Sequence, residues 1–201
     1  MIRLLFVHDD TLLRCALTSL LGAEEDIDVI PASWEEWARM EPRRQEAVWL
    51  VDATCAGFAR LADAAAPHRL YDPEDHGLVV LAPAGRPGLL HRAFEARALG
   101  YVSKEAAPQH LLDAIRTVAK GGRYVDEALA YDFLSASRMP LTPRELRVLS
   151  LAADGAPVPE IAGELWLAEG TVRNYLAAVI RKTGARNRVD AIRIARGAGW
   201  V

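Results

Sequence analysis

Five short, largely apolar runs recur through the first part of the chain, and each is followed by a stretch whose apolar residues recur at helical spacing. A strand that is apolar throughout is buried on both faces, which requires a parallel sheet covered by helices on both sides. We therefore expect an α/β fold with a five-stranded, doubly wound parallel sheet. The expected strands are Ile2–Val7, Ile27–Ile30, Val48–Val51, Leu78–Leu81 and Tyr101–Ser103, and the expected helices are Leu12–Leu21, Trp34–Met40, Phe58–Ala65, Leu89–Leu99 and Pro108–Ala119.

Polar residues stand where several of these strands end. His8, Asp9 and Asp10 follow the first strand, Asp52 follows the third and Lys104 follows the fifth. Because the carboxyl ends of parallel strands meet at one edge of a sheet, these side chains should gather there. Carboxylate oxygens can hold Mg²⁺ and accept a phosphoryl group, whose charge a lysine can balance. If the same side chains only pair with one another, they form an ionic cluster that takes no phosphate.

A second pattern occupies residues 141–201. Thr142 and Glu145 have the spacing of a capping box, which begins a helix. Apolar residues at helical spacing follow, then a short helix is expected near Glu160–Leu165 and a longer one at Glu169–Lys182. Two helices joined by a few residues, the second with basic and amide side chains near its start, predict an all-α helix-turn-helix domain.

This second pattern resembles the DNA-binding domain of LuxR-type regulators. The resemblance is carried by the motifs LTPRE, EIA, EGTVRNYL and GARNR. It implies that Arg173 and Asn174 face the major groove, where Arg can read guanine and Asn can read adenine, and that Ala177 can touch a thymine methyl group. It casts six more residues as phosphate-contacting or positioning residues: Thr171, Tyr175, Arg181, Lys182, Arg186 and Arg188. Ala168 stands where the family often has a Ser or Thr N-cap, so the recognition helix should lack a side-chain cap.

Residues 1–122 resemble the receiver domain of two-component response regulators. The matching motifs are MIRLLFVHDD, VWLVD and ALGYVSKEA with the following LLDAIRTVAKGG. The resemblance implies that Asp52 accepts a phosphoryl group, Asp9 helps to bind Mg²⁺, Lys104 pairs with the phosphate and Tyr101 is the switch aromatic. Together, the two resemblances are those of a LuxR/NarL-type response regulator, a DNA-binding transcription regulator and not an enzyme.

Three departures from the receiver pattern predict an atypical pocket. His8 stands at the first of two acidic positions, so Asp9 and Asp52 should form only a weak Mg²⁺ site. Ala82 replaces a Thr or Ser that would hydrogen-bond the phosphoryl group, and Cys55-Ala56-Gly57 replaces a Met-Pro-Gly turn. We expect a regulator that is phosphorylation-independent or weakly phosphorylated. Two alternatives stay open: a conventional regulator phosphorylated on Asp52 by a histidine kinase or a small phosphodonor, and a pocket that senses a small molecule.

Length and charge indicate two domains. A chain of 201 residues, 51% of them hydrophobic, can build two small cores. Residues 140–201 carry nine Lys/Arg and six Asp/Glu, a net charge of +3, whereas the rest of the chain carries −6. The basic charge thus lies with the helix-turn-helix, as in a binder of the DNA backbone. The expected domains are a receiver-like domain at 1–122, a helical linker at 123–140 and the helix-turn-helix domain at 141–201.

We expect the chain to bind double-stranded DNA as a homodimer, on paired half-sites about one helical turn apart. The resemblance to receiver domains implies a dimer face on the segment that carries Leu89, Leu90, Phe94, Leu99 and Tyr101. For most of these residues individually, a place in the core is the favoured interpretation.

The sequence argues against several other classes of protein. No apolar run approaches the ~20 residues that span a bilayer, and Met1–Val7 is too short for a signal peptide, so a cytoplasmic protein without membrane contact is expected. Cys15 and Cys55 are too few for a disulfide framework, and no Cys/His spacing suggests zinc. Apart from the weak Mg²⁺ site, no cofactor is expected. An α/β enzyme would need a nucleophile, an acid/base partner and a substrate pocket, and only Asp52 is a candidate nucleophile.

Overall fold

The computed structural model describes residues 1–39, 48–58, 61, 76–136 and 140–201. These residues form two compact units. The first comprises Met1–Ala84 and Leu89–Phe133, and the second comprises Gly85–Gly88 and Leu134–Val201. No helix of the described part is long and apolar enough to cross a membrane.

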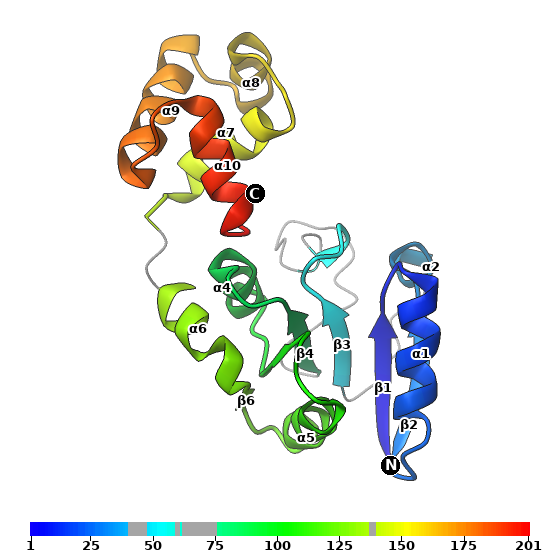
Figure 1. Ribbon diagram of the computed structural model, residues 1–201. Coiled ribbons are helices and arrows are strands. Elements are labelled where there is room, and N and C mark those ends of the chain that lie inside the picture. Colours follow the sequence, from blue (N-terminus) through cyan, green and yellow to red (C-terminus); the bar gives the residue numbers. More distant parts are fainter. Residues whose placement is uncertain (40–47, 59–60, 62–75, 137–139) are drawn as a thin grey trace. The chain divides into compact units, whose positions relative to one another are not determined.

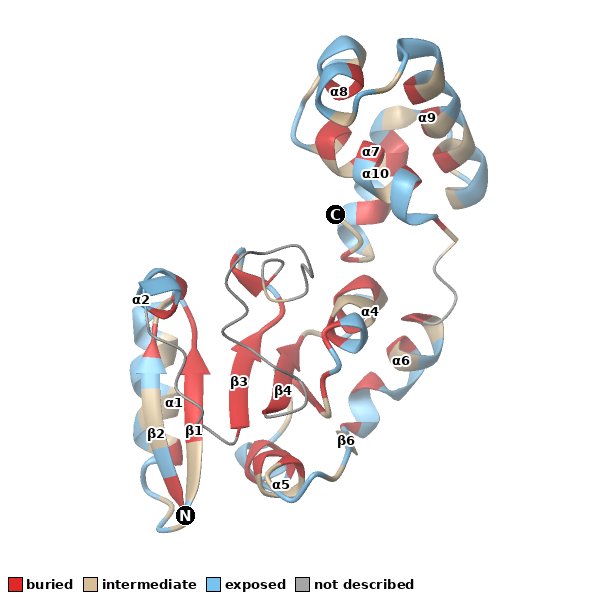
Figure 2. Ribbon diagram, turned by 180° about the vertical axis from the view of Figure 1, so that it is seen from behind, coloured by how far each residue is buried: buried red, intermediate tan, exposed pale blue. Residues whose placement is uncertain are grey.

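The first unit is built on a parallel sheet with the strand order β2-β1-β3-β4-β5-β6 (Figure 1). The central strands β3 and β4 are buried along their whole length (Figure 2), which is why their sequences are apolar without alternation. The predicted doubly wound parallel sheet is confirmed. The strands are β1 (Ile2–Val7), β2 (Ile27–Ala32), β3 (Val48–Asp52), β4 (Gly77–Ala82), β5 (Gly100–Ser103) and β6 (Tyr124–Val125).

The predicted number of five strands is wrong, because β6 adds a sixth. This strand has only two residues, neither of them fully buried, and it pairs with Gly100 and Tyr101 of β5. A two-residue strand is too short to show a hydrophobic period, so sequence patterning could not reveal it.

Helices cover both faces of the sheet. One face packs its Leu4, Leu50 and Val102 side chains in a core shared with α1 and α5. On the other face, Trp49 of β3 stacks edge-on against Trp37 of α2, and Tyr101 of β5 against Phe133 of α6. The helices of this part are α1 (Thr11–Leu21), α2 (Trp34–Arg39), α4 (Pro87–Glu95), α5 (Pro108–Val118), the 3₁₀ turn η1 (Glu127–Leu129) and α6 (Ala130–Ala136). Most of the helix expected at Phe58–Ala65 lies outside the described residues.

The second unit is helical: α7 (Pro143–Ala153), α8 (Val158–Leu165), α9 (Glu169–Thr183) and α10 (Arg188–Gly197). The predicted capping box is confirmed, since Thr142 Oγ1 accepts from the Glu145 N–H at 3.3 Å and Glu145 Oε2 accepts from the Thr142 N–H at 2.7 Å. The predicted α8–turn–α9 arrangement is also present. Helix α10 was not predicted; Asn187 caps it by accepting from the Asp190 N–H at 2.9 Å.

Candidate functional site

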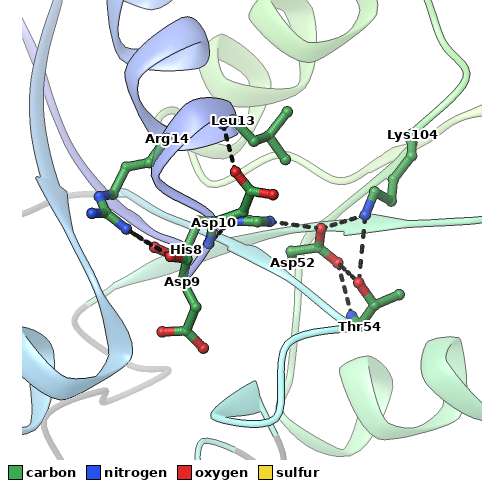
Figure 3. Close-up of polar contacts among 8 residues, drawn as sticks. All are labelled: His8, Asp9, Asp10, Leu13, Arg14, Asp52, Thr54 and Lys104. Carbon is green, nitrogen blue, oxygen red and sulfur yellow. Dashed lines mark hydrogen bonds and ion pairs between the residues drawn. The ribbon is translucent and has the colours of Figure 1, made fainter.

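Asp52 lies at the carboxyl end of β3 and is fully buried. Its Oδ2 lies 2.6 Å from Lys104 Nζ, which follows β5. Its Oδ1 accepts hydrogen bonds from the Thr54 N–H at 2.8 Å and from the Thr54 hydroxyl at 2.6 Å. The structure therefore brings Asp52 and Lys104 together, as the strand ends suggested, and adds Thr54, which the sequence analysis missed (Figure 3). A hydroxyl residue two positions after an Asp is the spacing at which such local bonds form.

His8 also contacts Asp52. It follows β1, is buried, and places Nε2 3.1 Å from Asp52 Oδ2. Its Nδ1 accepts a hydrogen bond from the Asp10 N–H at 2.9 Å. A neutral imidazole whose Nδ1 is an acceptor carries its proton on Nε2, so His8 donates to Asp52. The Arg14 guanidinium binds the His8 carbonyl and fixes the backbone of this loop.

The charge state of Asp52 follows from these contacts. Burial by itself raises the pKa of this carboxyl, but the hydrogen bonds from Lys104 and Thr54 and the positive charge of Lys104 outweigh burial and hold the pKa below its usual range. Asp52 is thus an anion at neutral pH, and both of its oxygens already accept from groups of its own chain.

The two expected Mg²⁺ ligands, Asp9 and Asp52, have different hydrogen-bond partners. Asp9 is exposed, and its Oδ1 accepts from the Trp34 N–H at 3.1 Å, at the start of α2. Figure 3 shows its carboxylate pointing away from Asp52. In this arrangement the Asp9 carboxylate is engaged at the start of α2, whereas Asp52 binds Lys104 and Thr54.

Among the described residues, His8, Asp52 and Cys55 have possible ligand atoms within 4.8 Å of one another. Two features of this cluster oppose metal binding. His8 Nε2 carries a proton and donates a hydrogen bond to Asp52, and burial raises the pKa of the Cys55 thiol, whereas a metal needs a free imidazole nitrogen and a thiolate. The arrangement suits a self-contained hydrogen-bond network better than a metal centre.

The two other predicted switch positions, Ala82 and Tyr101, are both buried. Ala82 ends β4, is fully buried and pairs in register with Ser103 of β5. Tyr101 lies in β5, and its hydroxyl donates to the Ala98 carbonyl at 3.0 Å. Burial raises the pKa of Tyr101 to about 12. Its ring packs against Phe133 of α6 with centroids 5.1 Å apart.

The candidate dimer face is largely core. Leu89, Leu90 and Tyr101 are buried, and Phe94 packs against Phe133 with ring centroids 6.4 Å apart. These contacts place the chain's own α6 on part of the face that was considered for a second copy.

The recognition helix α9 has two distinct faces. Val172, Leu176 and Val179 are buried in the helical unit. On the other side, the exposed residues recur at three- and four-residue spacing and form one stripe: Arg173, Asn174, Ala177 and Arg181. The predicted absence of a side-chain cap at Ala168 is confirmed. The stripe is continuous and basic at both ends, as a helix in the major groove requires.

Several of the other predicted contact residues hold the fold together. Lys182 Nζ lies 2.7 Å from the buried Glu145 carboxylate. Arg188 donates to the Ala156 carbonyl at 2.8 Å. Arg186 pairs with Asp190 at 3.2 Å. Thr171 and Tyr175 are half-buried.

Comparison with known proteins places the chain in a family. A family model described as bacterial regulatory proteins, luxR family, matches residues 139–195. The chain is 47% identical to the response regulator RamR of Streptomyces coelicolor, over 100% of this chain and 98% of RamR. It is 34% identical to the transcriptional regulatory protein DesR of Bacillus subtilis, over 100% of this chain and 99% of DesR. A solved structure of the RcsB–DNA complex shares the fold, with a TM-score of 0.61 and 19% identity over 98% of both chains.

The chain therefore belongs to the luxR family of response regulators and is a DNA-binding transcription regulator.

Proposed function

We propose that this regulator binds paired half-sites on double-stranded DNA as a homodimer, and that its receiver-like domain operates without phosphorylation of Asp52. The DNA-bound, dimeric arrangement is supported by the shared fold, since solved structures of RcsB include a DNA complex and two RcsB dimers bound to two parallel DNAs. We propose the domain bounds 1–122, 123–140 and 141–201, with β6 and Phe133 of the middle segment packed on β5 of the receiver-like domain. A cytoplasmic location and the absence of an enzymatic step belong to the same proposal.

The observation that carries the phosphorylation-independent assignment is the saturation of the Asp52 carboxylate. Lys104 and His8 bind Oδ2, and Thr54 binds Oδ1 twice. A phosphoryl group on either oxygen would have to displace these partners. It would also bring negative charge into a buried site whose acidic neighbour Asp9 is bonded to Trp34 instead of a metal.

The direct experiment is incubation of the full chain with acetyl phosphate and Mg²⁺, followed by intact-protein mass spectrometry. We expect no phosphoryl adduct on the wild-type chain beyond that on Asp52→Asn. An adduct that Asp52→Asn abolishes would show a conventional response regulator and overturn the assignment.

For the DNA interface, we propose that Arg173, Asn174 and Ala177 contact base edges and that Thr171 and Arg181 contact the backbone. The exposed stripe on α9 supports this assignment. Lys182, which the family resemblance casts as a phosphate contact, is better assigned to the fold because its ammonium group is held by Glu145. Selection of bound duplexes from a random pool tests the interface: the wild-type chain should recover one recurring half-site, and recovery of unrelated sequences would contradict the proposal.

A further inference from the structure

Glu169 and Arg173 form an ion pair at the start of the exposed stripe on α9. Glu169 Oε2 lies 2.6 Å from Arg173 Nη2, one helical turn away. The two side chains are 46% and 64% exposed, so in water the pair contributes little to the stability of the fold. Glu169 also stands four residues before Arg173 and eight before Ala177, which places all three on the same side of the helix. Its carboxylate is therefore part of the surface that would meet the DNA.

We propose that Glu169 is a specificity-determining residue, which holds Arg173 in the orientation that reads guanine. This inference rests on the proposed function, in which α9 enters the major groove. A guanidinium group has five N–H donors, and the contact with Glu169 uses only one of its nitrogens. Enough donors remain for the O6 and N7 acceptors of guanine. Because Glu169 already restricts the long Arg173 side chain, less conformational entropy is lost when the base is bound.

The Glu169 carboxylate should also weaken binding to DNA that lacks the guanine read by Arg173. Opposite a base pair that lacks the guanine acceptors, Arg173 and Glu169 both lose water and gain no new hydrogen bond. Glu169 also cancels the charge of Arg173 and repels nearby phosphates, which weakens binding that does not depend on sequence. Removing the carboxylate should therefore strengthen binding to random DNA while it weakens discrimination at one base pair.

The test uses the full chain, the duplex recovered by selection, the same duplex with the guanine–cytosine pair read by Arg173 replaced, and random DNA. That pair is the position at which Arg173→Ala loses discrimination. Glu169→Gln should reduce the affinity ratio between the selected and the replaced duplex by about tenfold, the size of one good base contact. It should also raise the affinity for random DNA. The matched control is Glu160→Gln, an exposed residue in the first turn of α8 with the same change of charge, which should keep the ratio within about twofold.

A double substitution separates positioning of Arg173 from other roles. If Glu169 acts through Arg173, Glu169→Gln should leave the affinity ratio of Arg173→Ala unchanged. The inference is overturned by an unchanged ratio in Glu169→Gln, by an equal fall in Glu160→Gln, or by a further fall in the double variant. These outcomes leave the proposed function standing, whereas a wild-type chain that prefers no sequence would contradict the proposed function itself.

Discussion

His8 Nε2 lies 3.1 Å from Oδ2 of Asp52 and donates a hydrogen bond to it, and His8 stands at the position where the receiver family usually has an acidic residue. An acidic side chain there would repel Asp52 and create a demand for a cation. The imidazole removes that repulsion and supplies a hydrogen bond. The negative charge of Asp52 is therefore balanced by side chains of the same protein, without a bound cation.

Replacing His8 by an acidic residue should restore the demand for a metal. We expect His8→Asp to lower the free energy of unfolding by about 2 kcal/mol without Mg²⁺, because two carboxylates then share a buried site. Added Mg²⁺ should recover part of the loss, measured as a rise in Tm. His8→Asn is the control, which should respond little to Mg²⁺. An His8→Asp chain as stable as the wild type and indifferent to Mg²⁺ would contradict this account of the pocket.

The depressed pKa of Asp52 predicts how stability depends on pH. The Asp52 carboxyl is ionised more readily in the folded than in the unfolded chain. Its ionised form therefore adds to the free energy of unfolding at pH values above the ordinary carboxyl pKa of about 3.9. That contribution is lost as the pH falls below this value through the lower folded pKa. Chemical unfolding at a series of pH values should show a loss of stability in this acidic window that is smaller in Asp52→Asn. Equal acid sensitivity of both proteins would mean that the Lys104 and Thr54 contacts do not stabilise the anion.

Lys182 and Arg181 are neighbours on α9 with different expected roles. Lys182→Ala leaves the buried Glu145 carboxylate without its cation and should cost about 1 kcal/mol of unfolding free energy, since the lysine side chain is still 32% exposed. Arg181→Ala should leave stability nearly unchanged. It should lower the slope of log affinity against log salt concentration by the amount that one phosphate contact contributes. Denaturation and binding titrations at several salt concentrations measure the two effects. The reverse pattern would contradict both assignments.

Phe133 packs its ring against Tyr101 of β5 and Phe94 of α4, so its removal should be costly. Phe133→Ala removes the ring that packs on the buried Tyr101 and on the partly exposed Phe94. It should reduce the unfolding free energy by about 2 kcal/mol, since the Phe133 ring is itself only partly buried. Tyr131→Ala is the matched control on the same helix: its side chain is 81% exposed, and the change should stay within about 0.5 kcal/mol. Similar losses in both variants would contradict a specific contribution of the Phe133 ring.

Local patterns in the sequence predicted much of this molecule. Periodicity defined the parallel sheet, and the spacing of Thr142 and Glu145 defined the start of α7, because each depends on residues near one another in the chain. Strand order also brought Asp52 and Lys104 together. Other contacts depend on side-chain orientation or on distant partners. A strand end does not decide whether Asp9 turns toward Asp52 or Trp34, and no local signal joins Lys182 to Glu145.

The operator affinity of the full chain, with and without acetyl phosphate and Mg²⁺, is the most direct test of a receiver-like domain that works without phosphate. The saturated Asp52 carboxylate predicts that wild type and Asp52→Asn bind a selected duplex equally well, within about twofold, and that the phosphodonor changes neither affinity. A phosphodonor-dependent gain of about tenfold in the wild type, absent from Asp52→Asn, would contradict the account.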